Sequence, residues 1–451
     1  MSTTTAITTT GPVVIAGMAV EAPGGIETPE GFYAALAGGV ELVEPFPRDR
    51  DWPVDQVLAL GALDGWGDVP DAGGFLHGAA EFDPLFFGVS PREAVAMDPQ
   101  QRVAMRVAWR ALENTGIDPT TLRDQEVGVY MGASIAEYGP RAAAVNDYSG
   151  HRVAGTALGA VAGRISHVLG TVGPSMTVDT ACASSLTALH LAANAIRTGE
   201  CDWALAGGVC VMGSPGAFFE FAKNNGLSAD GHCKSYSSAA TGTLWGEGVG
   251  VVIVEPEERA RRLGHRIFGT VLGTRVNHNG GGGPIVVPNA LAQQRLVERT
   301  IAAAGVSSAD IDVIEGHGTG TPLGDPMELE ALQNTYGASR PPDRPVLLGS
   351  VKSNAGHAQA AAGILGLIKV LLCGRHGQTV PSLYADTPTG ALDWDRGALA
   401  LSTELRPWAP RGDGQRYAAV SSFGVSGTNA HAIVAMPAAD RPGVESEAVS
   451  A

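Results

Sequence analysis

The sequence predicts an α/β protein in which parallel sheets are covered by helices, because strand-like and helical runs alternate along the chain. The run PVVIAGMAV at 12–20 precedes the helical pattern PEGFYAALAGG at 29–39, and VGVYMGAS at 127–134 precedes TALGAVAGRISHVLG at 156–170. Two further strand-like runs are WALAGGVCVMG at 203–213 and GVGVVIVEP at 248–256. No short-period repeat is visible, which excludes a solenoid.

A second observation predicts two halves of similar design. The stretch VDTACASSLTALHLAANAI at 178–196 has an extended start, a small-residue turn and a helical pattern. The same succession recurs in VKSNAGHAQAAAGILGLIKVLLCG at 351–374. This echo places Cys182 and His357 at comparable strand-to-helix junctions.

The charged segment EPEERARRLGHR at 255–266 interrupts the α/β pattern, and we place the division between the halves there. We expect a polar lead at 1–11, a first half at 12–258, a second half at 259–436 and a disordered tail at 437–451. The basic side chains of the charged segment either dock an acidic partner or form a solvated helix face, the interpretation we favour. They are Arg259, Arg261, Arg262 and Arg266.

Bulk composition narrows the class of protein and its compartment. The 451 residues carry 30 basic and 46 acidic side chains, a net charge of −16, which argues against nucleic acid or an anionic membrane as a global partner. The five cysteines form no CxxC pair, which argues against a disulfide framework and favours a reducing cytoplasm. No Lys or Arg precedes Arg48, so a secretory signal is not expected. The longest uncharged run, at 203–219, is broken by glycines and a proline, so no membrane-spanning helix is expected.

Cys182 is the first candidate for chemistry. Apolar residues recur at helical spacing from Ser184 onward, and Gly199 stands where a residue just past the helix end belongs. Cys182 therefore falls beside the first helical turn, where the helix dipole is expected to lower a thiol pKa. The alternative is an inert cysteine buried in the core.

Two histidines and a lysine lie in the second half of the chain. His317 sits in a glycine-rich loop that leads to a helix, for which Asp325 is the expected N-cap and Pro326 the first helical residue. Lys352 and His357 follow in KSNAGH. An imidazole serves a nucleophilic thiol well, because it moves protons at neutral pH.

Each of these residues has a structural alternative. The histidines would then be scaffold groups, Glu328 a capping-box partner of Asp325, Lys352 a solvated charge, and Thr319 and Thr321 ordinary loop hydroxyls. His190 is interpreted as a core histidine. No glycine loop has the sequence context of a nucleotide site, and no metal-ligand spacing links Cys182 with the two histidines, so no metal is expected.

Taken together, the motifs resemble the β-ketoacyl synthase (ketosynthase) family, and most closely the ketosynthases of modular type I polyketide synthases. They are DTACASS, EGHGTGTPLGDP, KSNAGHAQAAAG and SSFGVSGTNAH, within a resemblance that extends from about residue 12 to about residue 436. The resemblance implies a thiolase-like fold with two βαβ-rich halves in five αβαβα layers, normally in a homodimer. It also implies decarboxylative Claisen condensation of a Cys-bound acyl group with a malonyl-type unit on an acyl carrier protein.

The resemblance assigns roles by motif position. Cys182 is the acyl acceptor, His317 and His357 assist decarboxylation, and the backbone amides of Cys182 and Val425 form the oxyanion hole. Lys352 and Glu328 match the family's supporting ion pair, and Thr319 and Thr321 match hydroxyls that bind pantetheine. The protein would need no cofactor of its own, because the carrier protein supplies a phosphopantetheine arm. A separate acyltransferase is expected, since no acyltransferase or carrier motif occurs and the chain resembles a free-standing enzyme.

Departures from the family pattern concern the acyl substrate. The segment NHNGGGGPIVVPN at 277–289 replaces a polar stretch that usually begins NQDG, and Thr241 stands where the modular enzymes usually carry Asp. Two other functions stay open on the sequence alone: acyl transfer or release without decarboxylation, and a non-catalytic subunit that sets chain length or scaffolds an assembly.

Overall fold

The computed structural model describes residues 11–139, 145, 146, 148–281, 283–338, 340, 341, 343–394 and 398–438. Apart from Gly11, the predicted polar lead lies outside these residues. The predicted start of the tail is wrong, because Pro437 is the last residue of a strand. Beyond Ala438, the predicted tail lies outside the described residues.

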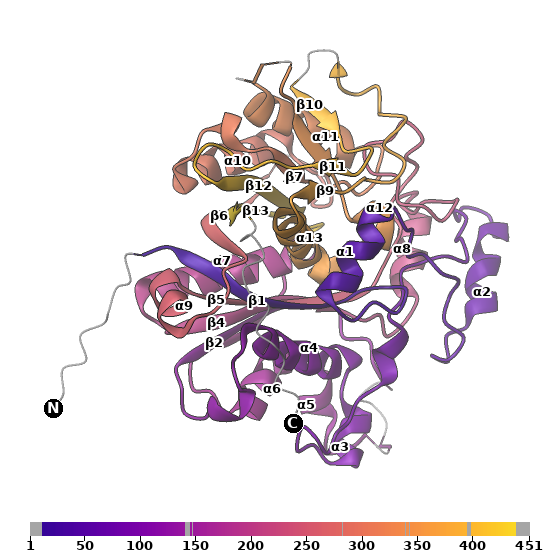
Figure 1. Ribbon diagram of the computed structural model, residues 1–451. Helices are drawn as coiled ribbons and strands as arrows, with labels where there is room; N and C mark the ends of the chain where they lie inside the picture. Colours follow the sequence, from indigo (N-terminus) through magenta and orange to yellow (C-terminus); the bar gives the residue numbers. More distant parts are fainter. Residues whose placement is uncertain are drawn as a thin grey trace.

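The described strands form one large mixed sheet in the order β10-β8-β7-β12-β13-β6-β1-β5-β4-β2-β3, and a small sheet of β9 and β11 (Figure 1). The strands of the first half are β1 (Val13–Glu21), β2 (Val127–Gly132), β3 (Ser175–Val178), β4 (Trp203–Cys210) and β5 (Gly248–Pro256). Those of the second half are β6 (Gly269–His278), β7 (Val313–Glu315), β8 (Val346–Gly349), β10 (Leu399–Leu401), β12 (Gln415–Phe423) and β13 (Thr428–Pro437), with β9 (Gln378–Thr379) and β11 (Arg406–Pro407) in the small sheet.

The strand order reveals the internal duplication that the sequence echo predicted. The first half reads β3-β2-β4-β5-β1, and the second reads β8-β7-β12-β13-β6, with an added edge strand, β10, on the outer side of β8. If β6, β7, β8, β12 and β13 are numbered 1 to 5 in chain order, both halves have the order 3-2-4-5-1. The halves join where β1 pairs antiparallel with β6, with Val13 opposite Val271.

Part of each half has the parallel strand pairs that the sequence predicted, and the other pairs are antiparallel. Pairs β2–β3, β2–β4, β7–β8, β7–β12 and β8–β10 are parallel. Pairs β4–β5, β1–β5, β12–β13 and β6–β13 are antiparallel. For β12 and β13 the reason is local, since the short turn between Phe423 and Thr428 reverses the chain with Gly427 at φ 89°. The sheet is therefore mixed, with parallel and antiparallel pairs in each half.

The described α-helices form three layers around the sheet. Those before β5 are α1 (Pro29–Ala37), α2 (Val54–Leu58), α3 (Pro91–Ala96), α4 (Pro99–Thr115), α5 (Arg152–Thr156), α6 (Ala160–Leu169), α7 (Ser184–Thr198) and α8 (Gly216–Lys223). Those after it are α9 (Glu257–Leu263), α10 (Ala290–Ala304), α11 (Gly324–Leu332), α12 (Lys352–Ala355) and α13 (Ala362–His376).

One buried apolar cluster joins α4 and α6 to the first half of the sheet, and another joins α10 and α11 to the second half. A central apolar cluster includes residues of α7 and α13. These two helices lie between the two halves of the sheet (Figure 1), so the five αβαβα layers are confirmed.

Small residues bring the two central helices together at their N-terminal ends. A Cβ atom added to Gly363 of α13 would lie 2.6 Å from Cγ of Leu186 in α7. The amide of Ile364 donates a hydrogen bond to Oγ of Ser185, at 3.0 Å. This close approach matters for function, because Cys182 and His357 precede these two helices.

The basic segment after β5 is less solvated than predicted. Arg259 is ion-paired with the buried Glu255, and its guanidinium lies 4.8 Å from the ring centroid of Trp203. Arg261 pairs with Glu257 and Arg262 with Glu258 along α9. Arg266 lies over the ring of Phe268. Only part of the cluster is therefore a free basic surface. Within the described residues, none of the helices has both the length and the apolar character needed to cross a membrane.

Candidate active site

Cys182 lies between β3 and α7, directly before Ala183, the residue that caps the helix. The preceding Ala181 has φ 52°, a left-handed conformation that turns the chain sharply between strand and helix. The carbonyl of Cys182 accepts a hydrogen bond of 2.6 Å from the hydroxyl of Ser422 in β12. Cys182, the candidate nucleophile of the first half, is thus anchored to a strand of the second half. α7 begins at Ser184 and ends before Gly199 at φ 74°, as predicted.

The electrostatic environment of the thiol differs from the sequence-based expectation. Burial raises the pKa of Cys182 above its ordinary value of 9.0. Backbone hydrogen bonds from Val425 and from Cys182 itself oppose this shift, as does the positive charge of Lys352. The expected lowering is therefore wrong, because removal of the anion from water outweighs the amide donors and the helix end. The two amides that contact the sulfur are those expected to form the oxyanion hole.

His317 lies in the loop between β7 and α11, and Glu328 holds the backbone of this loop. The Glu328 carboxylate accepts hydrogen bonds from the amides of His317 at 2.7 Å and Gly318 at 2.8 Å, and from the hydroxyl of Tyr236 at 2.8 Å. Glu328 therefore fixes the backbone at His317 and is not a capping-box partner.

The predicted cap of helix α11 is also wrong. The N-cap is Leu323, and Asp325 and Pro326 lie inside the first turn. The Asp325 carboxylate instead accepts hydrogen bonds from the amides of Tyr236 at 2.7 Å and Gly320 at 3.1 Å. Burial raises its pKa to about 7. Asp325 thus links the histidine loop to the segment around Tyr236.

His357 lies between α12 and α13, after Gly356 at φ 71°. Its amide donates to the carbonyl of Leu244 at 2.7 Å, and its carbonyl accepts from the amide of Gly246 at 3.0 Å. Its Nδ1 accepts a hydrogen bond of 3.1 Å from the amide of Gln359. Since Nδ1 is an acceptor, the neutral ring carries its proton on Nε2.

The structure brings Cys182, His317 and His357 together. One ligating atom of each lies within 4.8 Å of the others, and the two imidazole centroids are 5.3 Å apart. Nδ1 of His317 and Nε2 of His357 are buried and have no hydrogen-bond partner in the described protein. Burial and the charge of Lys352 hold the pKa of both histidines well below the ordinary value of 6.5. Both rings are therefore neutral and have a free polar atom. The expectation that no metal binds here stays a prediction.

Lys352 is buried, which excludes the solvated charge considered as an alternative. Desolvation lowers its pKa, and Glu315, Glu328, Cys233 and Cys182 oppose that shift. Among the ion pairs of the described residues, none joins Lys352 directly to Glu328. The family resemblance predicted an ion pair between Lys352 and Glu328. Here the two charges interact electrostatically without a direct contact, within a group of buried charges.

Cys182, His317 and His357 line a cavity of about 410 Å³. Thr319 and Thr321 contribute to its wall, with their hydroxyl oxygens 3.1 Å apart. Sequence reasoning did not single out Trp245 and Phe423, whose rings lie 5.2 Å from His357 and 5.4 Å from His317. Both stand in stretches without a periodic pattern, although Phe423 lies inside the SSFGVSGTNAH motif. His190 is not part of the cavity wall and bonds Thr274 and Asn194.

The fold and this cavity define a class of protein: a thiolase-like α/β protein with a Cys–His–His site between its two halves. Solved ketosynthase domains have the same architecture. The oxazolomycin ketosynthase domain OzmH KS7 of Streptomyces albus superimposes with a TM-score of 0.88 and 37% identity, covering 96% of this chain and 76% of that one. The ketosynthase from module 6 of the bacillaene synthase of Bacillus subtilis gives 0.86 and 34%, covering 95% and 72%.

The chain belongs to the beta-ketoacyl synthase family. The family's N-terminal domain matches residues 10–260 and its C-terminal domain matches residues 268–386. Similar proteins include polyketide synthase GfsB of Streptomyces halstedii, 49% identical over 424 residues, and erythronolide synthase EryA3 of Saccharopolyspora erythraea, 47% identical over 435 residues. This chain is covered to 94% and 96% but spans only 8% and 13% of those longer proteins.

Proposed function

We propose that this protein catalyses decarboxylative Claisen condensation between an acyl group on Cys182 and a malonyl-type thioester. The observation that carries the proposal is the convergence of one thiol and two neutral imidazoles in a single cavity. Each group supplies one requirement of the reaction: a nucleophile, and two polar NH groups placed where negative charge develops.

The first step is transfer of the acyl group. The Cys182 sulfur loses its proton and attacks the thioester carbonyl of the donor, forming a new carbon–sulfur bond. The amides of Cys182 and Val425, which already contact the sulfur, are in position to donate to the tetrahedral oxygen. The donor thiol then leaves with a proton, and the acyl group stays on Cys182.

The second step is decarboxylation and carbon–carbon bond formation. The bond between the malonyl carboxylate and its α-carbon breaks, CO₂ leaves, and the electron pair moves onto the thioester oxygen as an enolate. The free Nε2–H of His357 and the ring of His317 stabilise this oxygen, and one such donor is worth on the order of a hundredfold to a thousandfold in rate. The enolate carbon attacks the acyl carbonyl, and the Cys182 thiolate is released.

Partners follow from the same proposal. The acyl and malonyl groups arrive on the phosphopantetheine arm of an acyl carrier protein, and the hydroxyls of Thr319 and Thr321 lie on the cavity wall where they can bind that arm. No resident cofactor or metal takes part. A separate acyltransferase loads the carrier, and the location is cytoplasmic.

A homodimer through β3 is part of the proposal. β3 is the last strand of the large sheet, so one of its edges has no strand partner among the described residues. Met176 on this strand and the nearby Val172 are 43% and 56% exposed. A partly exposed edge strand with exposed apolar side chains on and beside it favours pairing with a second copy, which would extend the sheet across the dimer.

The test supplies purified protein with acyl-carrier and malonyl-carrier thioesters and determines the products by mass spectrometry. Condensation gives an acyl adduct on Cys182, one CO₂ per turnover and a β-ketoacyl product two carbons longer. An adduct that is transferred to an acceptor without CO₂ release would favour acyl transfer instead. Full product formation by a Cys182→Ala variant would point to a non-catalytic subunit.

A further inference from the structure

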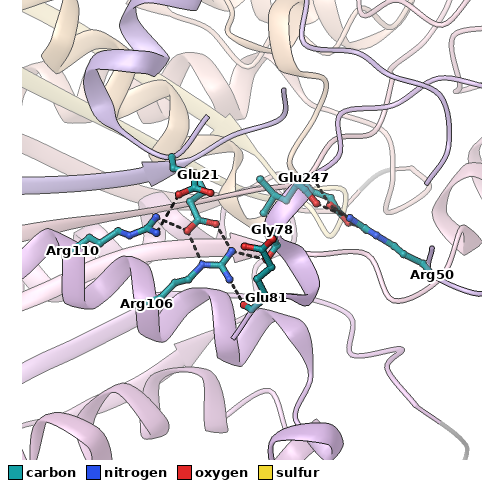
Figure 2. A network of polar contacts seen from close by, with 9 residues as sticks. Glu21, Arg50, Gly78, Glu81, Arg106, Arg110 and Glu247 are labelled. Carbon is teal, nitrogen blue, oxygen red and sulfur yellow. Dashed lines mark hydrogen bonds and ion pairs between the residues drawn. The ribbon is translucent and has the colours of Figure 1, made fainter. Parts of the chain in front are cut away.

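Two buried carboxylates beside the first half of the sheet are held by guanidinium groups, one by two of them and the other by one (Figure 2). Glu21 at the end of β1 pairs with Arg106 and Arg110 of α4. Glu247, directly before β5, pairs with Arg50, which comes from the loop before α2. The two carboxylates have almost equal burial, with side chains 3% and 0% exposed. Their surroundings differ, because only Glu247 belongs to the segment that contacts the catalytic site.

Four donors converge on the Glu247 carboxylate. Arg50 binds both carboxylate oxygens, with an Nη2–Oε2 distance of 2.9 Å. The amides of Leu76 and Met212 donate to Oε2 at 2.9 Å and to Oε1 at 2.8 Å. The Arg50 guanidinium also donates to the carbonyl of Leu76 at 3.0 Å and lies 5.5 Å from the ring centroid of Trp52. A carboxylate that binds three separate segments fixes the position of its own backbone.

That backbone is directly bonded to His357. Gly246 donates to the carbonyl of His357 at 3.0 Å, and Leu244 accepts from its amide at 2.7 Å. On its other side the segment pairs with Gly74, whose amide donates to the carbonyl of Trp245 at 3.0 Å. The space is tight, since a Cβ atom on Gly246 would lie 2.3 Å from the carbonyl oxygen of Ala355.

We infer that Arg50 and Glu247 are positioning residues for His357: the ion pair fixes segment 244–247, and this segment sets the placement of the imidazole in the cavity. The inference rests on the proposed function, because it assigns the pair to the step that His357 assists. Neither side chain contacts the reacting atoms. The pair acts on decarboxylation and carbon–carbon bond formation, and leaves acyl transfer to Cys182 largely unaffected.

The decisive variant is Arg50→Lys, which keeps the positive charge and loses the two-point contact with the carboxylate. The matched control is Arg106→Lys, which removes the equivalent two-point contact with Glu21. Arg106 bonds Glu21, Gly78 and Glu81, and none of these lies in segment 244–247 (Figure 2). The thermal midpoint of both variants is measured beside the rates, so that a general loss of stability is compared directly between them.

The two half-reactions are measured separately on the full chain. The rate of Cys182 acylation is followed by intact-protein mass spectrometry, and the rate of CO₂ release from malonyl-carrier protein is measured on the pre-acylated enzyme. For Arg50→Lys we expect CO₂ release to fall about tenfold to a hundredfold, as a displaced catalytic group requires, while acylation stays within about threefold. For Arg106→Lys we expect both rates to stay within about threefold of the wild-type rates.

Equal losses in both half-reactions of Arg50→Lys, or the same split in Arg106→Lys, would overturn the inference. If Arg50→Lys does not accumulate as folded protein, the double variant Arg50→Gln/Glu247→Gln removes both charges together and provides the same comparison without an unpaired buried ion. A wild-type protein that releases no CO₂ at all would contradict the proposed function, which is a distinguishable result.

Discussion

The two halves of the molecule share one strand order and contribute different chemistry. In the first half, the junction after β3 carries Cys182; in the second half, the equivalent junction after β8 carries His357. The helices that follow, α7 and α13, pack side by side in the central layer (Figure 1). Equivalent positions of a duplicated fold thus face each other. A thiol and an imidazole come together although they are far apart in the sequence.

The electrostatic roles of the halves differ as well. The first half supplies the thiol, which is hydrogen-bonded by its own amide and by the amide of Val425 from the second half, and burial keeps it protonated. The second half supplies two imidazoles, and burial together with the charge of the nearby Lys352 holds their pKa values low and keeps them neutral. A protonated thiol and neutral imidazoles carry no net charge in the resting state. In the proposed reaction negative charge develops only after the substrate binds, and the unpartnered atoms of the two imidazoles are available to stabilise it.

Removal of the proposed nucleophile should have the largest effect and should distinguish the chemical role of the first half from that of the second. Cys182→Ala should abolish the acyl-enzyme completely, because no other described cysteine lines the cavity. Intact-protein mass spectrometry after incubation with acyl-carrier protein checks this. Cys201→Ala, a buried cysteine outside the cavity, is the matched control and should acylate as the wild type does.

Removing a group of the second half should leave the first half active. His317→Asn should lower CO₂ release by about 10²- to 10³-fold, because one polar donor is lost from the enolate. Acylation of Cys182 should continue at a rate within about tenfold of the wild-type rate. A variant in which both half-reactions fall together would contradict the division of labour between the halves.

The resting charge states can be tested by pH. Below its raised pKa, the Cys182 thiolate fraction increases about tenfold per pH unit, so alkylation by iodoacetamide should accelerate steadily from pH 7 to pH 9. Because both histidine pKa values are held well below 6.5, the profile should have no inflection near that pH. A plateau reached near pH 7 would indicate a stabilised thiolate and reverse the sign of the proposed shift.

A smaller effect tests how closely the halves must approach. Gly363→Ala places a methyl group 2.6 Å from Cγ of Leu186, so α7 and α13 must separate at the site. We expect a loss of about 1–3 kcal/mol in the free energy of unfolding, together with slower condensation. Gly163→Ala in α6 is the control, because nothing lies within 4 Å of the added Cβ and helix propensity favours alanine by about 0.5–1 kcal/mol. Denaturant unfolding of both variants measures the difference.

The sequence was sufficient for the features that repeat or that follow local patterns. The echo between 178–196 and 351–374 correctly predicted two halves and equivalent positions for Cys182 and His357, because junctions of a duplicated fold keep the same order of strand, turn and helix. The start of α7 at Ser184 and its end before Gly199 follow from spacing and a left-handed residue.

Features that depend on distant contacts were missed. Arg50 and Glu247 are 197 residues apart, and no local pattern relates them. Asp325 has the residue type of an N-cap, but its carboxylate satisfies Tyr236 and Gly320 instead. The sign of the Cys182 pKa shift depends on burial, which the position beside a helix does not reveal. The antiparallel strand pairs likewise depend on the path of the chain between strands.

The central claim is that one thiol of the first half and two neutral imidazoles of the second half carry out a single condensation. Its most direct measurement combines a ¹³C-labelled malonyl carboxylate with acyl-carrier protein and follows the label. We predict one labelled CO₂ for each β-ketoacyl product, with the acyl intermediate on the peptide that contains Cys182. A product that retains the label, or one that forms without an acyl group on Cys182, would contradict the account.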